Sequence, residues 1–344
     1  MKAVRIHKPG GPEELRYEDA PDPKPGPGEA VVWVKGCALN RLDLLTRANG
    51  FRGAFAQPHI VGSDIAGEVA ALGEGVSGFQ VGVPVVVAPG SGCWRCAACL
   101  SGNENLCMDY RIFGARPGLD GGYAELIKVP ATSLIAKPAK LSFEEAASIP
   151  VTFLTAYHMV MARGGLKLGE TVLIHAVGSG IGIAALQIAK LTGATAIVTA
   201  GSDEKLARAK ALGADHTVNY KTADFVQEVR RITDKRGVDM VVDTVGAGVL
   251  EKSLPLVVGG GRVVACGGTA GRQVPLDLAP MYYRSVSIIG SNMGNRAELV
   301  HVLGLFGAGK LKPVVHSVLP LSEAAQAHRI LEERQNFGKV VLVP

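Results

Sequence analysis

The stretch TVLIHAVGSGIGIAALQIAKLTGA, residues 171–194, decides the fold class of this chain. Its first residues are mostly apolar, which predicts a buried strand, and its last dozen have the pattern of an amphipathic helix. Between them lie Gly178, Gly180 and Gly182, which would bring bare backbone N–H groups and a helix N-terminus against a pyrophosphate. The spacing is not the strict G-x-G-x-x-G, so a plain β-α turn is the alternative interpretation.

The sequence on the C-terminal side of this stretch continues to alternate between apolar strands and helical segments. Each helical segment is long enough to connect two parallel strands, so the alternation predicts a parallel, doubly wound sheet in an α/β fold. We expect strands at 171–175, 196–200, 216–219, 240–243, 262–266 and 286–289, and helices at 181–191, 204–212, 223–232 and 248–257. A further helix at 296–306 and a strand at 339–343 would return to the first domain.

The first 135 or so residues have a different texture. Short apolar stretches such as 30–34, 65–71 and 83–88 are separated by Gly and Pro clusters, which predicts a β-barrel. The length of 344 residues suits two domains. We therefore expect a barrel domain made of residues 1–150 and 293–344, and a dinucleotide-binding domain made of residues 151–292.

Four cysteines in the run CWRCAACLSGNENLC have metal-ligand spacing. Cys93, Cys96, Cys99 and Cys107 form a C-x2-C-x2-C-x7-C array, which predicts one tetrahedral zinc ion in a lobe at 91–110 of the barrel domain. A disulfide network is the alternative, but the chain has only six cysteines and the other two are far apart. Four sulfurs leave no position for water or substrate, so this zinc would be structural.

The composition limits the partners of the protein. Hydrophobic residues make up 47% of the chain and charged residues 19%, as in a folded globular protein, and a net charge of +5 is too mild to indicate nucleic acid. The N-terminus has no signal-peptide core, and no run approaches the ~18 apolar residues of a membrane span. We expect a cytoplasmic protein with a small-molecule substrate and no membrane partner.

The end of the second strand bears on the choice of cofactor. An acidic residue there would bind the ribose hydroxyls of NAD and repel a 2′-phosphate, but the strand runs into Gly201 and Ser202, and the next acid starts a helix. Lys205, Arg208 and Tyr220 can supply charge and a hydroxyl to a phosphate. The sequence favours NADP(H) over NAD(H); the alternative is that these cations are a solvated helix face.

The order of these parts resembles the medium-chain dehydrogenase/reductase superfamily. The phrases that carry the resemblance are GGPEELRYEDAPDPKPGPGEAVVWV, GSDIAGEVAALGEGVSGFQVG, DGGYAELIKVP and ASIPVTFLTAY. The resemblance implies a GroES-like barrel with a Rossmann domain, and a homodimer or homotetramer, formed through the edge strand in SVSIIGS. It also implies that the following residues lie near the cofactor: Thr155, Ser179, Ile181, Gly267, Gly338 and Lys339.

Zinc alcohol dehydrogenases of this superfamily hold a second, catalytic zinc, and the resemblance lets its ligand places be compared. The C-x-x-D phrase becomes Asn40 to Asp43, the G-H-E phrase becomes Gly-Ser63-Asp64, and the third place falls near Val151. These side chains make a poor zinc site because none is an imidazole or thiolate. We expect Asp64 to orient Asn40 or a group near the cofactor. The N-x-x-D phrase is similar to that of the quinone oxidoreductase branch.

Two nearby residues leave a rearranged metal site open. Cys37, His59 and Asp64 could bind zinc together, although a Cys in an apolar strand is usually a core residue. No tyrosine follows Asp43 closely to act as a proton donor, since that stretch offers only Thr46. The expected substrate pocket includes Phe51, Phe55 and Tyr110.

Together these features predict an NADPH-dependent reductase that transfers hydride to a quinone, an enone or a reactive carbonyl. The Asn40 amide would hydrogen-bond the substrate oxygen, with Asp43 and Asp64 as further catalytic-site residues. Two alternatives remain. One is a zinc-dependent alcohol dehydrogenase with the rearranged metal site, and the other is a non-catalytic NADPH-binding protein with a structural or sensing role.

Overall fold

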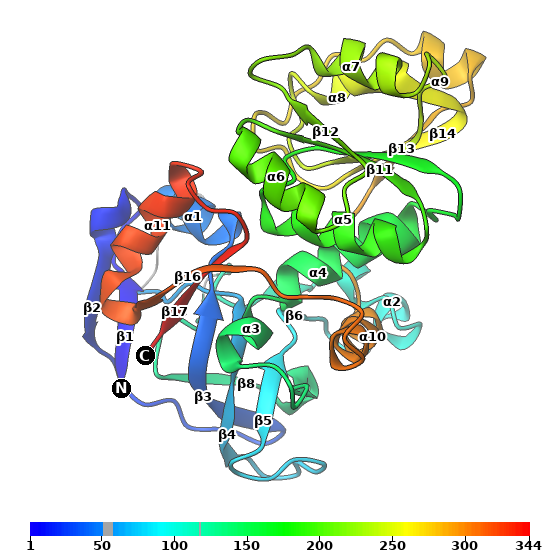
Figure 1. Ribbon diagram of the computed structural model, residues 1–344. Coiled ribbons are helices and arrows are strands. Elements are labelled where there is room, and N and C mark those ends of the chain that lie inside the picture. The colour runs from blue at the N-terminus through cyan, green and yellow to red at the C-terminus, as the bar shows by residue number, and fades with distance from the viewer. Residues whose placement is uncertain (51–57, 117) are drawn as a thin grey trace. The chain divides into compact units, whose positions relative to one another are not determined.

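The computed structural model describes residues 1–50, 58–116 and 118–344, so Phe51 and Phe55 lie outside the described residues. The chain divides into two compact units (Figure 1). The barrel unit is Met1–Val151 with Asn295–Pro344, and the nucleotide unit is Thr152–Gly294.

The nucleotide unit is built on a six-stranded sheet in which every neighbouring pair is parallel. The strand order is β12-β11-β10-β13-β14-β15, so the direction in which strands are added reverses between β10 and β13. This is the doubly wound topology that the sequence predicts. The strands are β10 (Thr171–Ile174), β11 (Thr195–Ala200), β12 (His216–Asn219), β13 (Val238–Asp243), β14 (Val257–Ala265) and β15 (Ser287–Gly290).

Helices cover both faces of this sheet, with α5 and α6 on one face and α7 and α8 on the other (Figure 1). The expected helix at 248–257 is wrong in its extent. Its α-helical part ends at Ser253, because Pro255 has no N–H to continue it, and Val257 already begins β14. The helices are α4 (Pro150–Tyr157), α5 (Gly180–Leu191), α6 (Asp203–Ala211), α7 (Phe225–Ile232), α8 (Leu250–Ser253) and α9 (Ala279–Tyr283).

The barrel unit is built around one long strand, β3 (Glu29–Ala38), which pairs with three others. Its core is apolar and contains Val32, Val69 and the fully buried ring of Tyr123. The sheet order is β16-β17-β3-β4-β5-β9, with β8 also on β3. The other strands are β1 (Lys2–Ile6), β2 (Leu15–Asp19), β4 (Asp64–Leu72), β5 (Pro84–Val87), β6 (Gly90–Ser91), β7 (Arg111–Ile112), β8 (Leu126–Pro130), β9 (Leu134–Ala136), β16 (Val315–Pro320) and β17 (Lys339–Val343).

The C-terminal part of the chain completes this barrel sheet. β17 runs antiparallel to β3, with Leu342 opposite Cys37, and this pairing brings the start of β17 close to the end of β3. The expected strand at 339–343 is confirmed, whereas β16 and the helix α11 were not predicted. The helices of the unit are α1 (Arg41–Asn49), α2 (Ala97–Leu100), α3 (Phe143–Ala147), α10 (Arg296–Gly307) and α11 (Ala324–Glu332).

Among the helices of the described residues, none has both the length and the apolar character that a membrane-spanning segment needs.

Candidate functional site

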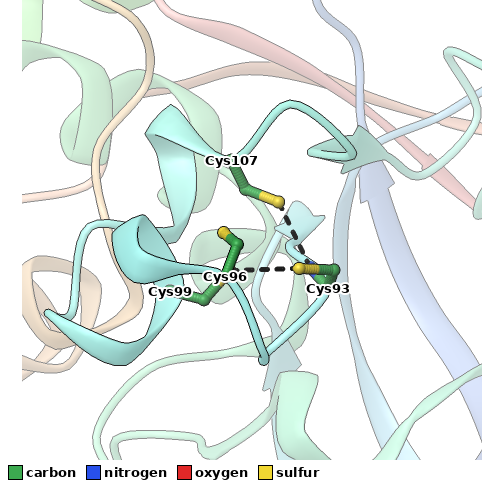
Figure 2. Close-up of side chains that lie close together, drawn as sticks. All are labelled: Cys93, Cys96, Cys99 and Cys107. Carbon is green, nitrogen blue, oxygen red and sulfur yellow. Dashed lines mark hydrogen bonds between the residues drawn. The ribbon is translucent and has the colours of Figure 1, made fainter.

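The four predicted zinc ligands converge in the lobe (Figure 2). Their Sγ atoms all lie within 4.8 Å of one another, and those of Cys93 and Cys99 are 4.0 Å apart. A tetrahedral ion with Zn–S bonds of ~2.3 Å places its sulfurs ~3.8 Å apart, so the four thiols fit zinc with small adjustments. All four are free thiols, and the described residues contain no disulfide. This geometry favours the zinc interpretation over the disulfide network.

Local structure prepares this cluster for a metal. The backbone N–H of Arg95 is the main cause that lowers the pKa of Cys93 to about 6, and the backbone N–H of Cys93 donates to the Cys107 Sγ at 3.4 Å. N–H groups directed at sulfur favour the thiolate, which is the form that binds metal. The lobe is also anchored to α10, because the buried carboxylate of Glu104 accepts a hydrogen bond from the backbone N–H of Arg296. The lobe thus has the organisation of a structural zinc site.

The turn between β10 and α5 has the features of a phosphate-binding turn. Ser179 precedes the helix, and its Oγ accepts a hydrogen bond from the N–H of Gly182 at 3.1 Å. A Cβ on Gly182 would lie 2.5 Å from the carbonyl oxygen of Ala176, so only glycine fits. Gly178, Gly180 and Ile181 lie in the same turn. The residues present therefore fit the pyrophosphate of a dinucleotide, with backbone N–H groups at the start of a twelve-residue helix.

The residues expected at the adenosine end lie after β11. The Ser202 side chain caps α6 by accepting a hydrogen bond from the Lys205 N–H at 3.3 Å. Asp203 is the first residue of α6, and its carboxylate accepts a hydrogen bond from the Asn219 side chain at 2.7 Å. Tyr220 lies over Gly201, where a Cβ would come 2.7 Å from its hydroxyl oxygen. Ser202, Lys205 and Tyr220 therefore lie beside the turn that follows β11, and the Asp203 carboxylate there is already hydrogen-bonded.

The other residues that the resemblance assigned to the cofactor are spread over both units. Thr155 is a buried residue of α4, and its hydroxyl lies 3.6 Å from the Met293 sulfur. Gly267 follows β14 with a φ of 93°. Gly338 has a φ of 95°, and a Cβ there would lie 2.3 Å from the Val314 carbonyl oxygen. The Gly338 conformation sets the start of β17 and hence the position of Lys339.

A buried polar cluster joins three of the predicted site residues. Asn40 follows β3, Asp64 begins β4 and Lys339 begins β17, and their residue exposures are 7%, 0% and 5%. The Lys339 Nζ donates to Asn40 Oδ1 at 2.7 Å, to Asp64 Oδ2 at 2.9 Å and to the Leu39 carbonyl at 2.5 Å. The Asn40 Nδ2 donates to Asp64 Oδ2 at 2.9 Å. Sheet pairing brings these residues together, because β3 lies between β4 and β17.

A second buried chain of hydrogen bonds ends at Asp43. An arginine only donates, so the Arg47 guanidinium donates to His328 Nδ1 (3.0 Å), and the neutral ring then carries its proton on Nε2. This Nε2–H donates to the Tyr123 hydroxyl (3.2 Å), which donates to Asp43 Oδ2 (3.4 Å). Burial raises the pKa of Asp43 to about 7 and, with the Arg47 charge, lowers the pKa of His328 to about 3. The Asn40 backbone N–H also donates to Asp43, at 2.7 Å.

The residues that the resemblance assigns to the ligand places of the catalytic zinc do not fit a metal. The Ser63 hydroxyl donates to the Phe113 carbonyl at 2.7 Å, and Val151 contributes only its N–H, which donates to Asp64 Oδ1 at 2.6 Å. The Asn40 side chain is bonded at both ends, as described above. None of these groups is a strong zinc ligand with a free lone pair directed at a common point.

The rearranged site is also not formed. His59 uses Nε2 to bond the Gly114 carbonyl at 3.0 Å, and its Nδ1 lies 3.3 Å from Asp120. Burial raises the pKa of the Cys37 thiol well above its usual range, which disfavours the thiolate. Within the described part of the chain, the four cysteines of the lobe are the only group of three or more His, Cys, Asp or Glu placed to share an ion. The alternative of a zinc site made of Cys37, His59 and Asp64 is therefore not supported by the described residues.

Sequence reasoning missed three members of the buried network. Arg47, Tyr123 and His328 come from α1, the segment before β8, and α11, and no spacing in the sequence connects them. Tyr123 lies in the phrase DGGYAEL that resembles the superfamily, but nothing in that phrase indicates a partner at position 328. Only the packing of α11 against the barrel core brings these side chains together.

Comparison with known proteins identifies the family. Residues 26–139 match the family model for the alcohol dehydrogenase GroES-like domain, and residues 180–307 match that for zinc-binding dehydrogenase. A solved structure of an NAD-dependent alcohol dehydrogenase is 48% identical, with a TM-score of 0.96 over the whole of both chains. In Sulfurisphaera tokodaii, acryloyl-coenzyme A reductase is 31% identical and an NAD-dependent alcohol dehydrogenase 32% identical, each over the whole of both chains. The chain thus belongs to the medium-chain dehydrogenase/reductase superfamily of oxidoreductases.

Proposed function

We propose that this oxidoreductase transfers a hydride to an electrophilic acceptor, namely an enone, a quinone or a reactive carbonyl, without a catalytic zinc. The observation that carries the proposal is the Asn40 amide. The resemblance assigns it to a place where zinc alcohol dehydrogenases of the superfamily have a metal ligand, and hydrogen bonds with Lys339 and Asp64 hold it. A substrate that is already electrophilic does not need a Lewis acid.

The Asn40 amide can stabilise negative charge on a substrate oxygen. Its Nδ2 carries two hydrogens, of which one donates to Asp64, and no other described residue accepts the second. Hydride addition to the β-carbon of an enone turns the conjugated system into an enolate, whose charge rests mainly on oxygen. An N–H donor already in place stabilises that charge without reorganisation, and a missing donor of this type costs ~2.7–4 kcal/mol in comparable sites.

The remaining atoms of the reaction are accounted for simply. NADPH, when bound, supplies the hydride. One proton from solvent then adds to the α-carbon of the enolate, or to the oxygen when the acceptor is a carbonyl. With a quinone, the hydride and one proton together give the hydroquinone, and in each case NADP⁺ is the other product. Unsaturated acyl thioesters belong to the same electrophile class, and the relative named acryloyl-coenzyme A reductase supports including them among the substrates.

The preference for NADP(H) is part of this proposal. It is supported by the turn after β11, where Ser202, Lys205 and Tyr220 lie and where the Asp203 carboxylate is hydrogen-bonded to Asn219. The relatives named NAD-dependent alcohol dehydrogenases favour NAD(H) instead. Titration of the protein with NADPH and with NADH, followed by cofactor fluorescence, decides between them. Tighter NADPH binding that is lost in Lys205→Ala supports the proposal, and tighter NADH binding contradicts it.

A second candidate function is alcohol oxidation, which the names of those same relatives favour. It requires a metal or another group that lowers the pKa of the alcohol, and the Asn40, Ser63 and Val151 set offers none. A third, an NADPH-binding protein without turnover, predicts cofactor binding and no reduction of any acceptor.

One experiment tests all three functions on the same purified sample. Zinc per chain is measured together with NADPH oxidation by benzoquinone, cyclohexenone and acryloyl-coenzyme A, and with alcohol oxidation before and after chelation. One zinc with reduction of these acceptors supports the proposal. Two zinc ions with chelator-sensitive alcohol oxidation contradict it, and cofactor binding without turnover favours the third function.

A further inference from the structure

We propose that Lys339 and Asp64 are positioning residues that fix the Asn40 amide in one orientation, so that it offers an N–H and not its carbonyl oxygen to the substrate. This inference rests on the proposed function and concerns two charged side chains that do not themselves contact the reacting atoms. It assigns them a role different from the cofactor contact that the resemblance implies for Lys339.

An asparagine side chain is nearly symmetric in shape, so packing alone does not distinguish its oxygen from its nitrogen. Charge does. The Lys339 ammonium can only donate, and therefore the atom 2.7 Å from it must be the Asn40 oxygen. The Asp64 carboxylate, paired with the Lys339 ammonium, only accepts, and therefore the atom 2.9 Å from its Oδ2 must be the Asn40 nitrogen. Rotating the amide by half a turn would create two repulsive contacts in place of two hydrogen bonds.

The hydrogen bonds of both charged groups, Lys339 and Asp64, are made within the cluster. The three hydrogens of the Lys339 ammonium go to Leu39, Asn40 and Asp64, so no donor remains for a phosphate. Asp64 accepts the Val151 N–H on Oδ1, and accepts Asn40 and Lys339 on Oδ2. A buried ion pair that keeps no spare donor has little to offer a ligand directly, and it acts through the side chain that it holds.

The cluster is also rigid because three neighbouring strands carry it. Asp64 pairs with Ala38 in the β3–β4 ladder, and β17 pairs with β3 at Ala38 and Cys37. The ends of these strands cannot shift independently without breaking ladder hydrogen bonds. Preorganisation of this kind is what a donor needs in order to stabilise a developing charge.

The test is a kinetic double-mutant cycle on the full chain. The variants are Asn40→Ala, the pair Lys339→Met with Asp64→Asn, and all three changes together. The pair removes both charges at once, so no buried charge is left unpaired. We measure kcat with cyclohexenone, the KM of cyclohexenone, the dissociation constant of NADPH and the thermal midpoint.

We expect kcat to fall about a hundredfold to a thousandfold in Asn40→Ala and by a similar factor in the charge-free pair. The triple variant should fall no further than Asn40→Ala, because residues that act only through Asn40 have no effect once it is gone. NADPH binding should stay within about twofold of wild type throughout. Losses that multiply, full kcat in the charge-free pair, or weakened NADPH binding in the pair would each overturn the inference.

If the charge-free pair does not fold, Lys339→Arg provides the second variant. Arginine keeps the positive charge but moves its donors away from Asn40, and we expect a lower kcat in the wild-type background with no effect in Asn40→Ala. A merely structural lysine would lower the thermal midpoint equally in both backgrounds and leave the kcat of folded protein unchanged, which contradicts the inference. Wild-type protein without turnover on any acceptor would instead remove the proposed function itself.

Discussion

At the residue scale, Asp43 is a carboxyl group held away from water with a strongly raised pKa. It is fully buried, and its Oδ1 has no hydrogen-bond partner among the described residues. Burial raises its pKa to about 7, while hydrogen bonding by the Asn40 N–H and the charge of Lys339 act in the opposite direction. The raised pKa means that the native state holds this proton over a pH range in which the unfolded chain has lost it.

This difference predicts a pH dependence of stability. The unfolded carboxyl ionises near pH ~3.9 and the native one near 7, so Asp43 makes the wild type lose stability as pH rises between those values, by up to ~1.4 kcal/mol per pH unit. Asp43→Asn keeps the oxygen acceptor and removes the titration. We expect the stability of Asp43→Asn relative to wild type to increase from pH 5 to pH 8, measured by urea unfolding. A constant difference across this range would contradict the shifted pKa.

The prediction uses the difference in stability between Asp43→Asn and wild type at each pH, because buried histidines change stability with pH in the opposite direction to Asp43. Burial lowers the pKa of His175 to about 4, and its ring is held neutral between Thr199 and Ser253. The unfolded histidine binds a proton near pH ~6.5, so this group costs stability as pH falls from there toward 4. The same contribution is present in wild type and Asp43→Asn and cancels in the difference.

At the scale of elements, the turn from β10 to α5 gives the next prediction. A methyl group at Gly182 would meet the Ala176 carbonyl at 2.5 Å, so Gly182→Ala must move the turn or the helix start. We expect it to cost ~1–3 kcal/mol and to weaken NADPH binding at least about tenfold, by fluorescence titration. Gly304 in α10 is the matched control, because a Cβ there meets nothing within 4 Å. Gly304→Ala should bind NADPH normally and gain up to ~1 kcal/mol.

The zinc lobe gives a prediction of its own. Cys96→Ser removes one of the four thiolates, so we expect zinc content well below one ion per chain, together with altered emission from Trp94 in the same lobe. Cys266→Ala is the control, because Cys266 lies after β14 and is not part of the cluster. It should retain one zinc. Full zinc content in Cys96→Ser would show that the cluster does not hold the ion.

Sequence patterns predicted the structure well where the residues of a single element are enough to determine it. The strands β12 and β17 have the expected bounds, and α5 begins at Gly180, within the glycine-rich turn that the sequence predicted. The cysteine spacing likewise predicted a cluster that the structure forms, since all four thiols lie within fifteen residues of sequence. β16 and α11 were not predicted, because their apolar residues gain apolar neighbours only when these segments pack on the barrel core. The Asn40, Asp64 and Lys339 contacts span up to 299 residues, and no sequence period reports such pairings.

At the scale of the whole molecule, the open edge of the nucleotide-unit sheet bears on assembly. β15 ends the strand order, and no described strand pairs with its outer edge. The Ser291 N–H bonds the Ala265 carbonyl of β14, so by alternation the Ile288 N–H points away from β14. An exposed edge of this kind can extend a sheet into a second copy.

Proline at position 288 tests this mode of association. Ile288→Pro removes the outward donor, and Ile288→Ala removes the same side chain but keeps the N–H. If two copies pair through β15, sedimentation should show the wild type and Ile288→Ala as oligomers and Ile288→Pro as a monomer. Unchanged mass in Ile288→Pro, with the fold intact by circular dichroism, would place the interface elsewhere.

The position of β17 in the middle of the barrel sheet, between β16 and β3, has a consequence for synthesis on the ribosome. The nucleotide unit is one continuous segment, so it can fold as soon as residue 294 has emerged. Residues 1–151 of the barrel unit are translated before the nucleotide unit, yet the end of β3 stays unpaired with β17 until residues 339–343 arrive. Lys339 comes with that same strand. The order of emergence therefore makes the amide of Asn40, encoded near the start, one of the last groups in the protein to acquire its orientation.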